Sequence, residues 1–446
     1  MLTSAIPDRS SRVGLALAGG GPEGAVYEIG VLRALDEAID GLDFNNLPVY
    51  VGVSAGAFLS ANLANGLTTA QNARAIVKHE PGEHPFHPKT FFTPALGEMV
   101  RRSLMTPRLA FEAVLDYLRH PTDLTFGESL LRLSRALPVG VFDNEPIRDY
   151  LERIFSLPGR TNDFRQLRRK LIVVATELDS GLAVRFGEPG HDHVPISVAV
   201  QASTALPGLY PPVLIDGRHY VDGVLLKTLH ASVALDAGAK LVICINPIVP
   251  VDTLHAEERR TRERRLTELG LPTVLSQTFR TLIHSRMTVG MAAYAPRFPR
   301  QDLVLFEPKS DDYRMFFTNI FSFSSRKAVC EYAYAATRRE LLLRFDELAP
   351  IFARHGLRLR EEVLLDADCD LWAGVGLDGG DGRDWGRGEL PVTRALDRAL
   401  RSLELWVDRQ QGAPIPGHPA GRGTRVLSAH PRAGRGGRRR AAPAKA

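Results

Sequence analysis

The fold is decided by residues 12–40, RVGLALAGGGPEGAVYEIGVLRALDEAID, and residues 48–66, PVYVGVSAGAFLSANLANG. In each stretch a short apolar run is followed by a glycine-containing turn and then by residues with helical periodicity. The order strand, turn, helix is therefore predicted twice in succession. Repeated β-to-α order indicates a mostly parallel sheet covered by helices on both faces, which is a three-layer α/β/α architecture.

The same alternation returns further along the chain. Strands are predicted over 170–176, 213–215, 219–221, 240–246 and 304–306, and a helix over 197–205. Residues 79–137 mix prolines, aromatic residues and amphipathic stretches, and are interpreted as a lid-like helical insertion. The patterns divide the chain into an α/β domain over 1–345, a helical extension with a Gly/Asp-rich linker over 346–410, and a basic disordered tail over 411–446.

The composition is that of an ordinary globular protein, with 446 residues of which 44% are hydrophobic and 24% charged. The formal net charge of +5 comes from the tail, where eight Lys or Arg and no acidic residue follow Gln411. A solvated terminus explains that composition more simply than a nucleic-acid partner, which we do not expect. The oligomeric state leaves no signal in the sequence.

The cysteines and the hydropathy bear on location. Cys244, Cys330 and Cys369 are scattered and form no Cys-x-x-Cys pair, which favours a reducing compartment, the cytoplasm. The N-terminus lacks the basic and apolar regions of a signal peptide. No run of about 18 apolar residues occurs, so any membrane contact is expected to be peripheral.

Residues 19–24, GGGPEG, form the first glycine cluster and satisfy the pattern G-x-G-x-x-G between a strand and a helix. Glycines there let backbone N–H groups point into space at a helix N-terminus, where they stabilise a pyrophosphate or a developing oxyanion. The first possibility is an NAD-type oxidoreductase. It requires an acidic residue at the end of the second strand, and this chain has none there.

The second strand ends instead in Gly52-Val53-Ser54-Ala55-Gly56, which is the pattern G-x-S-x-G. This pattern is typical of a nucleophile elbow, a strained strand-to-helix turn that presents a serine hydroxyl at the edge of a sheet. The position after a predicted strand and before a predicted helix makes the match more specific than the pentapeptide alone. Ser54 is therefore the candidate nucleophile.

A nucleophilic serine needs a base, and VLIDGRHYVDGVLL, residues 213–226, offers two Asp-Gly pairs. Asp216-Gly217 lies between two strand-like runs, as the two-residue loop of a β-hairpin does. Asp222-Gly223 follows the second run, where the end of a strand can deliver a carboxylate to an active site. Asp222 is therefore the candidate base.

Histidine is the usual partner of a catalytic serine, and the chain has 13. His191, His193 and His219 carry no diagnostic motif, and His230 follows Asp222 by only eight residues, which favours a structural role. No zinc-binding pattern and no P-loop lysine is present, so neither a metal nor a cofactor is expected.

Taken in order, GGGPEG, GVSAG and ASTALPGLYPPVLIDGRHYVDGV resemble the patatin-like phospholipases. The resemblance covers roughly residues 13–246. It implies that the domain over 1–345 is a serine acyl hydrolase acting on acyl lipids through a Ser54–Asp222 dyad without histidine. Backbone N–H groups of Gly19, Gly20 and Gly21 would form the oxyanion hole.

In the same motifs, Gly24, Gly52, Gly56 and Gly223 have a supporting role. Two positions depart from the family pattern: Glu23 replaces a basic residue, and Val224 stands where Gly or Ala is typical. These departures leave a non-catalytic lipid-binding or scaffold relative as the alternative to an enzyme. A carboxylate at position 23, beside an anionic phospholipid or a developing oxyanion, would be unfavourable.

Overall fold

The computed structural model describes residues 12–78, 86, 92–100, 138–252, 266–310, 323–366, 369–375 and 425–428, together with 102, 104, 106–108 and 111. Most of the expected lid-like insertion and of the tail therefore lies outside the described residues. Within the described residues no helix is long and apolar enough to cross a membrane.

The centre of the molecule is a sheet with the strand order β13-β11-β10-β1-β3-β6-β9-β8, and β7 pairs with the free side of β6. Five neighbouring strands, β11, β10, β1, β3 and β6, run parallel. β13, β9 and β7 join them antiparallel, and β8 pairs antiparallel with β9. The bounds are β1 Val13–Leu17, β3 Val49–Val53, β6 Lys170–Glu177, β7 Ala183–Phe186, β8 Val213–Ile215, β9 Arg218–Asp222, β10 Leu241–Ile245, β11 Asp302–Phe306 and β13 Arg425–Ser428.

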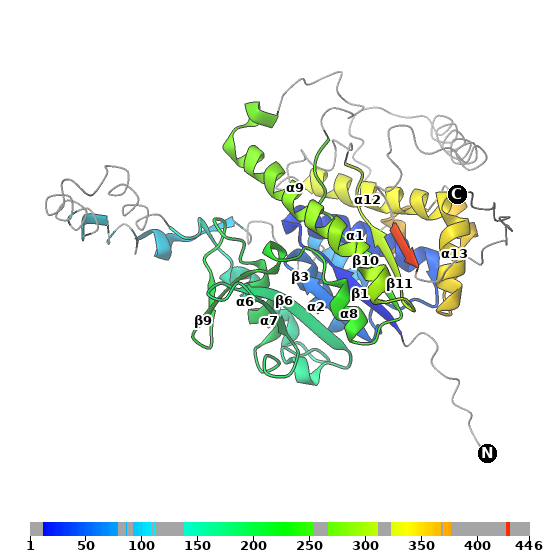
Figure 1. Ribbon diagram of the computed structural model, residues 1–446, viewed down its shortest axis with the longest axis horizontal. Coiled ribbons are helices and arrows are strands. Elements are labelled where there is room, and N and C mark those ends of the chain that lie inside the picture. Colours follow the sequence, from blue (N-terminus) through cyan, green and yellow to red (C-terminus); the bar gives the residue numbers. More distant parts are fainter. Residues whose placement is uncertain are drawn as a thin grey trace, which may run out of the picture.

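Helices cover both faces of this sheet, as the alternation of apolar residues requires. Leu15 and Leu17 of β1 belong to a core shared with α1 Gly21–Ala38, α2 Ala55–Ala64, α6 Glu145–Phe155, α7 Ile196–Thr204 and α12 Phe323–Leu343. Ala16 and Ala18 belong to a second core with α8 Ala231–Asp236 and α9 Leu271–Ala292. The protein is thus a three-layer α/β/α fold with a mostly parallel sheet (Figure 1), as predicted from the sequence.

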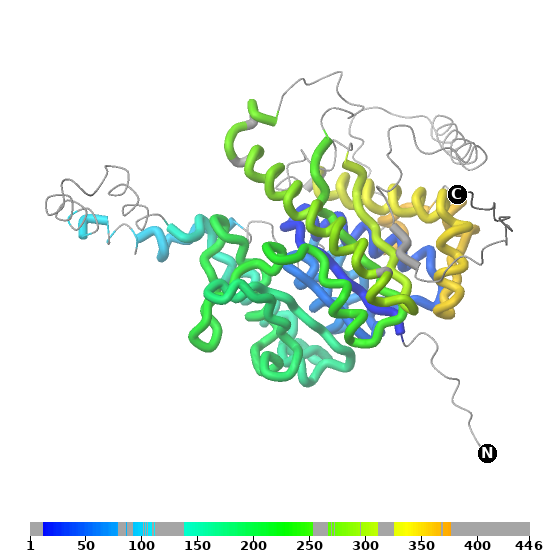
Figure 2. The backbone as a smooth tube through the Cα atoms, viewed as in Figure 1, coloured from blue at the N-terminus to red at the C-terminus, as the bar shows by residue number. Residues whose placement is uncertain are grey.

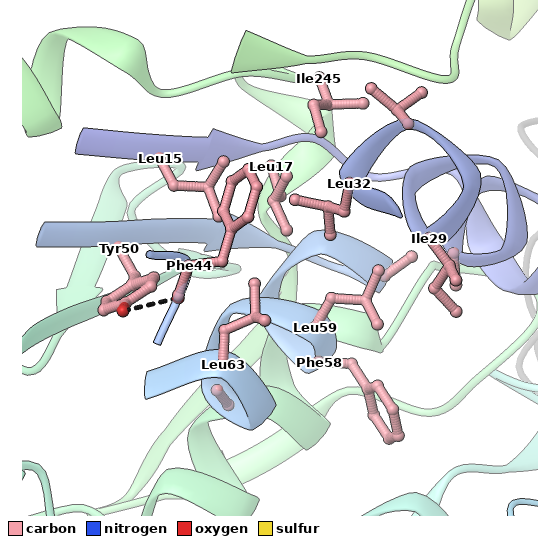
Figure 3. Close-up of a cluster of buried hydrophobic side chains, with 14 of the residues drawn as sticks. Leu15, Leu17, Ile29, Leu32, Phe44, Tyr50, Phe58, Leu59, Leu63 and Ile245 are labelled. Atoms are coloured by element: carbon pink, nitrogen blue, oxygen red, sulfur yellow. Dashed lines mark hydrogen bonds between the residues drawn. The ribbon is translucent and has the colours of Figure 1, made fainter. Parts of the chain in front are cut away.

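The first of these cores is the larger. Figure 3 shows part of it, in which Leu15, Leu17 and Ile245 of the strands face Leu32 of α1 and Leu59 of α2. The Tyr50 hydroxyl, although buried, donates a hydrogen bond of 2.8 Å to the carbonyl of Phe44. A polar group inside this apolar layer is therefore satisfied by the backbone.

The C-terminal helices pack on the same core. α13 Phe345–Arg354 and α14 Glu361–Leu365 follow α12, and β12 Arg358–Leu359 pairs antiparallel with β2 Ile39–Asp40 at the end of α1. Leu348, Phe352 and Trp372 are buried with residues of α1. In Figure 2 the backbone of this yellow region lies against the blue N-terminal segment. The helical extension expected after residue 345 thus shares its core with the preceding domain.

The remaining elements are short: α3 Thr69–Asn72, η1 Ala73–Lys78, β4 Thr93–Pro94, β5 Phe142–Asp143, η4 Phe164–Gln166, η5 Gly223–Leu225, η7 Leu266–Leu269, α10 Tyr294–Arg297 and η8 Ala373–Val375.

Candidate active site

The pairing of β6 brings two distant segments together. Along one side of β6, Val174 pairs with Val53, the last residue of β3, and the next residue, Ala175, pairs with Asp222, the last residue of β9. Because β3 is parallel to β6 and β9 antiparallel, both strands end at the same point. Ser54, which follows Val53, and Asp222 therefore meet at this edge of the sheet.

Ser54 occupies a strained turn. Its φ is 53° and its ψ is −121°, a backbone conformation that residues other than glycine rarely adopt. Ser54 directly precedes α2. The side chain is only 7% exposed. The Ser54 N–H donates a hydrogen bond of 2.9 Å to the hydroxyl of Ser203 in α7, which in turn donates one of 2.6 Å to the Val174 carbonyl. α7 and β6 together hold the turn in place.

The glycines on either side of Ser54 allow the turn to be this tight. A Cβ on Gly56 would lie 2.5 Å from the Ala18 carbonyl oxygen, to which the Gly56 N–H donates a hydrogen bond of 3.0 Å. A Cβ on Gly52 would lie 2.5 Å from the Cα of Ala57. Both distances exclude any side chain, so these two positions need glycine for space.

Asp222 is a buried carboxyl group, 2% exposed, at the end of β9. Burial raises the pKa of Asp222 from 3.8 to about 7. Hydrogen bonds from the Val224 N–H and the Ser54 side chain lower this pKa, but by less than burial raises it. The Val224 N–H lies 2.9 Å from Asp222 Oδ1. The carboxyl thus has a proton affinity suited to exchange near neutral pH, and it shares a hydrogen bond with the candidate nucleophile.

The glycine loop borders the same point. A Cβ on Gly19 would lie 3.2 Å from Ser54 Cβ, so the loop passes directly beside the serine. Gly20 is the N-cap of α1, and Gly21, with a φ of 60°, is its first residue. Backbone N–H groups in the first turn of a helix have no partner within the helix. Such donors, at the positive end of the helix dipole, are available to an anion beside Ser54.

The two departures from the expected motifs each have a structural counterpart. Glu23, in the first turn of α1, forms an ion pair with Arg280 of α9 at 3.9 Å between Oε2 and Nη2. Burial lowers the pKa of Arg280, and the charge of Glu23 raises it. Val224 is buried, and its Cγ2 would lie 3.3 Å from a Cβ on Gly19. The Val224 side chain therefore fills the space beside Gly19, and the Val224 N–H donates a hydrogen bond to Asp222.

Gly24 and Gly223 are also in crowded positions. A Cβ on Gly24 would lie 2.9 Å from Pro247, and one on Gly223 would lie 2.5 Å from the Val174 carbonyl oxygen.

The other residues weighed in the sequence lie elsewhere. Asp216 and Gly217 join β8 to β9 with φ angles of 50° and 77°, a two-residue hairpin loop, and the Asp216 carboxylate lies 2.8 Å from His193 Nε2. His219 lies 4.0 Å from Asp179, and His191 packs against Phe186.

His230 precedes α8, where burial lowers its pKa to about 3. It is therefore neutral near pH 7. No group of His, Cys, Asp and Glu able to hold a metal ion occurs in the part of the chain that the structure describes.

Two residues of the site escaped the sequence reasoning. Ser203 lies within the segment predicted as a helix, but its hydrogen bond spans 149 residues to Ser54. Arg280 lies 257 residues beyond Glu23, its partner, in a helix that carries no motif. The ASTALP segment, which contains Ser203, was the one sequence signal for that residue. No local pattern indicates a role for Arg280.

The fold and these residues define a class of protein: a three-layer α/β protein with a serine on a strained strand-to-helix turn, beside a buried carboxyl group and a glycine loop. Residues 15–235 match the family model of the patatin-like phospholipases. The chain therefore carries a patatin-like phospholipase domain, as its motifs suggested. This family supports a lipid acyl hydrolase in general terms.

Solved structures with a similar chain include VipD from Legionella pneumophila, with 13% identity over 91% of this chain and 89% of that chain and a TM-score of 0.32. The type III effector ExoU of Pseudomonas aeruginosa has 16% identity over 89% and 62% of the two chains and a TM-score of 0.32. Human GIVD cytosolic phospholipase A2 has 15% identity over 55% and 42%, and a TM-score of 0.24. At these values the likenesses add no argument to the family match.

Proposed function

We propose that this protein is a serine-dependent carboxylic ester hydrolase of acyl lipids, with Ser54 as nucleophile and Asp222 as base. One observation carries the proposal most strongly. The buried Asp222 carboxyl, with a pKa raised to about 7, shares a hydrogen bond with the hydroxyl of a serine held in a strained turn. A base of this pKa accepts and returns a proton near neutral pH.

In the first half of the reaction, Ser54 Oγ attacks the ester carbonyl carbon while its proton passes to Asp222. The carbonyl oxygen becomes an oxyanion, and N–H groups of Gly19, Gly20 and Gly21 donate hydrogen bonds to it. When the tetrahedral intermediate collapses, the alcohol leaves with the proton from Asp222. The acyl group then remains on Ser54 as an ester.

In the second half, Asp222 takes a proton from a water molecule that attacks the acyl-enzyme. The new tetrahedral intermediate is held by the same amides, and its collapse releases the carboxylic acid and returns the proton to Ser54. Each oxyanion donor contributes about 3–4 kcal/mol in comparable enzymes, so the orientation of the loop amides matters as much as the dyad.

The proposed setting is the cytoplasm, with peripheral contact to membranes. Its support is that Cys244, Cys330 and Cys369 are free, the first two buried in separate parts of the core. The acyl lipid class rests on the family match.

The test is hydrolysis of a soluble short-chain ester and of a long-chain phospholipid by four purified proteins. We expect the wild type and Asp216→Asn to hydrolyse esters equally, since Asp216 lies in the hairpin loop. Ser54→Ala and Asp222→Asn should lose at least about 100-fold in rate, the contribution typical of a positioned nucleophile or base. Full activity in folded Ser54→Ala or Asp222→Asn would refute the proposal.

A further inference from the structure

The segment that follows β10 lies against the glycine loop. In the strand order β10-β1-β3, β1 leads into that loop, and its two neighbours lead into Asn246 and Ser54 (Figure 1). The three strands are parallel, so the segments that follow them meet at the same edge of the sheet. The glycine loop therefore has the turn at Ser54 on one side and residues 246–252 on the other.

Pro247 packs directly on the glycine loop. A Cβ on Gly20 would lie 2.6 Å from Pro247 Cγ, and a Cβ on Gly24 would lie 2.9 Å from the same atom. On the other side of the loop, a Cβ on Gly19 would lie 3.2 Å from Ser54 Cβ. Consecutive glycines have wide conformational freedom by themselves. Contacts on both sides of the loop therefore restrict the directions in which its N–H groups point.

The side chain of Asn246 fixes the turn that carries Pro247. It is fully buried, and Nδ2 donates hydrogen bonds of 3.0 Å to the Ile248 carbonyl and 3.1 Å to Glu307 Oε2. Oδ1 accepts a hydrogen bond of 3.1 Å from the Ile248 N–H. The Asn246 N–H donates one of 2.9 Å to the carbonyl of Phe306, the last residue of β11. One residue thus closes the turn around Pro247 and ties it to β11.

The far end of the same segment is also held. Gln277 of α9 accepts a hydrogen bond of 3.0 Å from the Val251 N–H and donates one of 2.8 Å to the Val251 carbonyl. The Asp252 N–H donates a hydrogen bond of 2.7 Å to the Ser310 carbonyl. Residues 246–252 are therefore fixed at both ends, which lets Pro247 act as a rigid support for the loop.

We propose that Asn246 is a positioning residue of the proposed oxyanion hole. By holding Pro247 against Gly20 and Gly24, it keeps the N–H groups of the glycine loop directed at the carbonyl oxygen of the substrate. The inference rests on the proposed function, and it adds a residue outside 15–235, the part of the chain that matches the family model. Asn246 acts through the loop and takes no part in proton transfer.

This role predicts a particular kinetic effect. The oxyanion exists only once the ester carbonyl has been attacked, so a misdirected loop lowers kcat and leaves KM almost unchanged. For Asn246→Ala we expect kcat on a soluble short-chain ester to fall at least about tenfold, with KM within about twofold of wild type. The pH at half-maximal rate should stay as in wild type, because Asp222 is unaltered.

A short-chain alkyl trifluoromethyl ketone probes the loop without turnover. Ser54 Oγ adds to its carbonyl carbon, the serine proton passes to Asp222, and the former carbonyl oxygen becomes an oxyanion. The affinity of Asn246→Ala for this ketone should fall by about the same factor as its kcat. A purely structural role would lower stability without this parallel loss.

The experiment includes a second test variant and a matched control. Pro247→Ala removes ring atoms that contact the loop and leaves the Asn246 side chain in place, so it tests the same support if Asn246→Ala does not fold. The control is Asn65→Ala at the C-cap of α2. Asn65 is also buried, donating 3.2 Å to the Ala61 carbonyl and accepting 2.8 Å from the Thr161 N–H. The control should lose stability but keep kcat and ketone affinity.

Three results would overturn the inference while the wild type remains an active esterase. Folded Asn246→Ala or Pro247→Ala would keep the wild-type kcat, or their loss would appear in KM alone, or Asn65→Ala would lose as much kcat as the test variants. A folded wild type that neither hydrolyses esters nor binds the ketone would instead refute the proposed function, and this role of Asn246 with it.

Discussion

Asp222 combines two properties that oppose each other: it is buried, and the proposed mechanism needs it ionised. Its pKa is raised to about 7, so the carboxylate form that accepts the Ser54 proton gains population as pH rises through 7. We expect kcat/KM for a soluble ester to rise with pH and to reach half its plateau near pH 7. A profile whose midpoint lies near 4 would show that this carboxyl is not the controlling base.

The same group affects folding stability. The folded-state pKa lies above the ordinary value of 3.8, so the folded state binds the proton more tightly than the unfolded state does. The free energy of unfolding is therefore larger while Asp222 is protonated, and it decreases as pH rises towards 7. The shift corresponds to about 4 kcal/mol. We therefore expect folded Asp222→Asn to gain stability relative to wild type between about pH 4 and pH 7, measured by urea unfolding. A difference in the free energy of unfolding between the two proteins that does not change with pH would contradict this prediction.

Ser203 links the backbone of the proposed nucleophile to β6. Its hydroxyl accepts from the Ser54 N–H and donates to the Val174 carbonyl, and all three groups are buried. Ser203→Ala should cost about 1–3 kcal/mol for each buried group left unsatisfied, and it should lower kcat because the nucleophile turn loosens. Urea unfolding and ester kinetics measure the two effects.

The matched control is Ser60→Ala. Ser60 is equally buried, and its hydroxyl donates a long hydrogen bond of 3.5 Å to the Val51 carbonyl rather than bonding the Ser54 backbone. It should lose stability but keep kcat. Equal losses of kcat in both variants would assign Ser203 a purely structural role.

At the scale of elements, α9 supplies a charge to the first turn of α1. Without Arg280, the Glu23 carboxylate would lose this ion pair in the helix turn next to the proposed oxyanion hole. Repulsion over about 8 Å at an effective dielectric constant of about 20 amounts to about 2 kcal/mol. We expect Arg280→Gln to lower kcat on a soluble ester by at least about tenfold, and Glu23→Gln/Arg280→Gln to recover most of it.

The double-mutant cycle decides this interpretation. Strictly additive effects of Glu23→Gln and Arg280→Gln on kcat would show that the two side chains act independently. Recovery in the double variant would show that Glu23 is compatible with catalysis because α9 balances it.

At the scale of the whole molecule, the α/β fold extends well beyond the family match. The match ends at residue 235, yet β10 pairs with β1 in the middle of the sheet, and α12 packs on α1. The crossing of the two helices is close, since a Cβ on Gly30 would lie 2.4 Å from the Cys330 carbonyl oxygen. A chain without α12 would expose the buried face of α1.

We therefore expect a chain ending at residue 322 to lack a cooperative thermal transition and ester hydrolysis, because it loses α12 to α14 and their share of the core. A chain ending at residue 375 should keep both, because it retains every described helix. Circular dichroism melting and short-chain ester kinetics measure the outcome. A cooperative, active chain ending at 322 would contradict this account of the domain.

The sequence predicted what is encoded locally. The strand, glycine loop and helix around Gly19, and the turn at Ser54, follow from short-range patterns, and the family resemblance was confirmed over residues 15–235. What local patterns could not predict depends on the pairing of distant segments. The bond from Ser54 to Ser203, the ion pair from Glu23 to Arg280 and the meeting of β3 and β9 along β6 exist only once the sheet is assembled.

The measurement that tests the central claim most directly is covalent labelling of the folded protein with a fluorophosphonate, with the adduct located by mass spectrometry. Only an activated serine reacts readily with such a probe. The account predicts one adduct per chain, on Ser54, absent in Ser54→Ala, much slower in Asp222→Asn and undiminished in Asp216→Asn. A folded wild-type protein that stays unlabelled, or that is labelled on another serine, would contradict the assignment of Ser54 and Asp222.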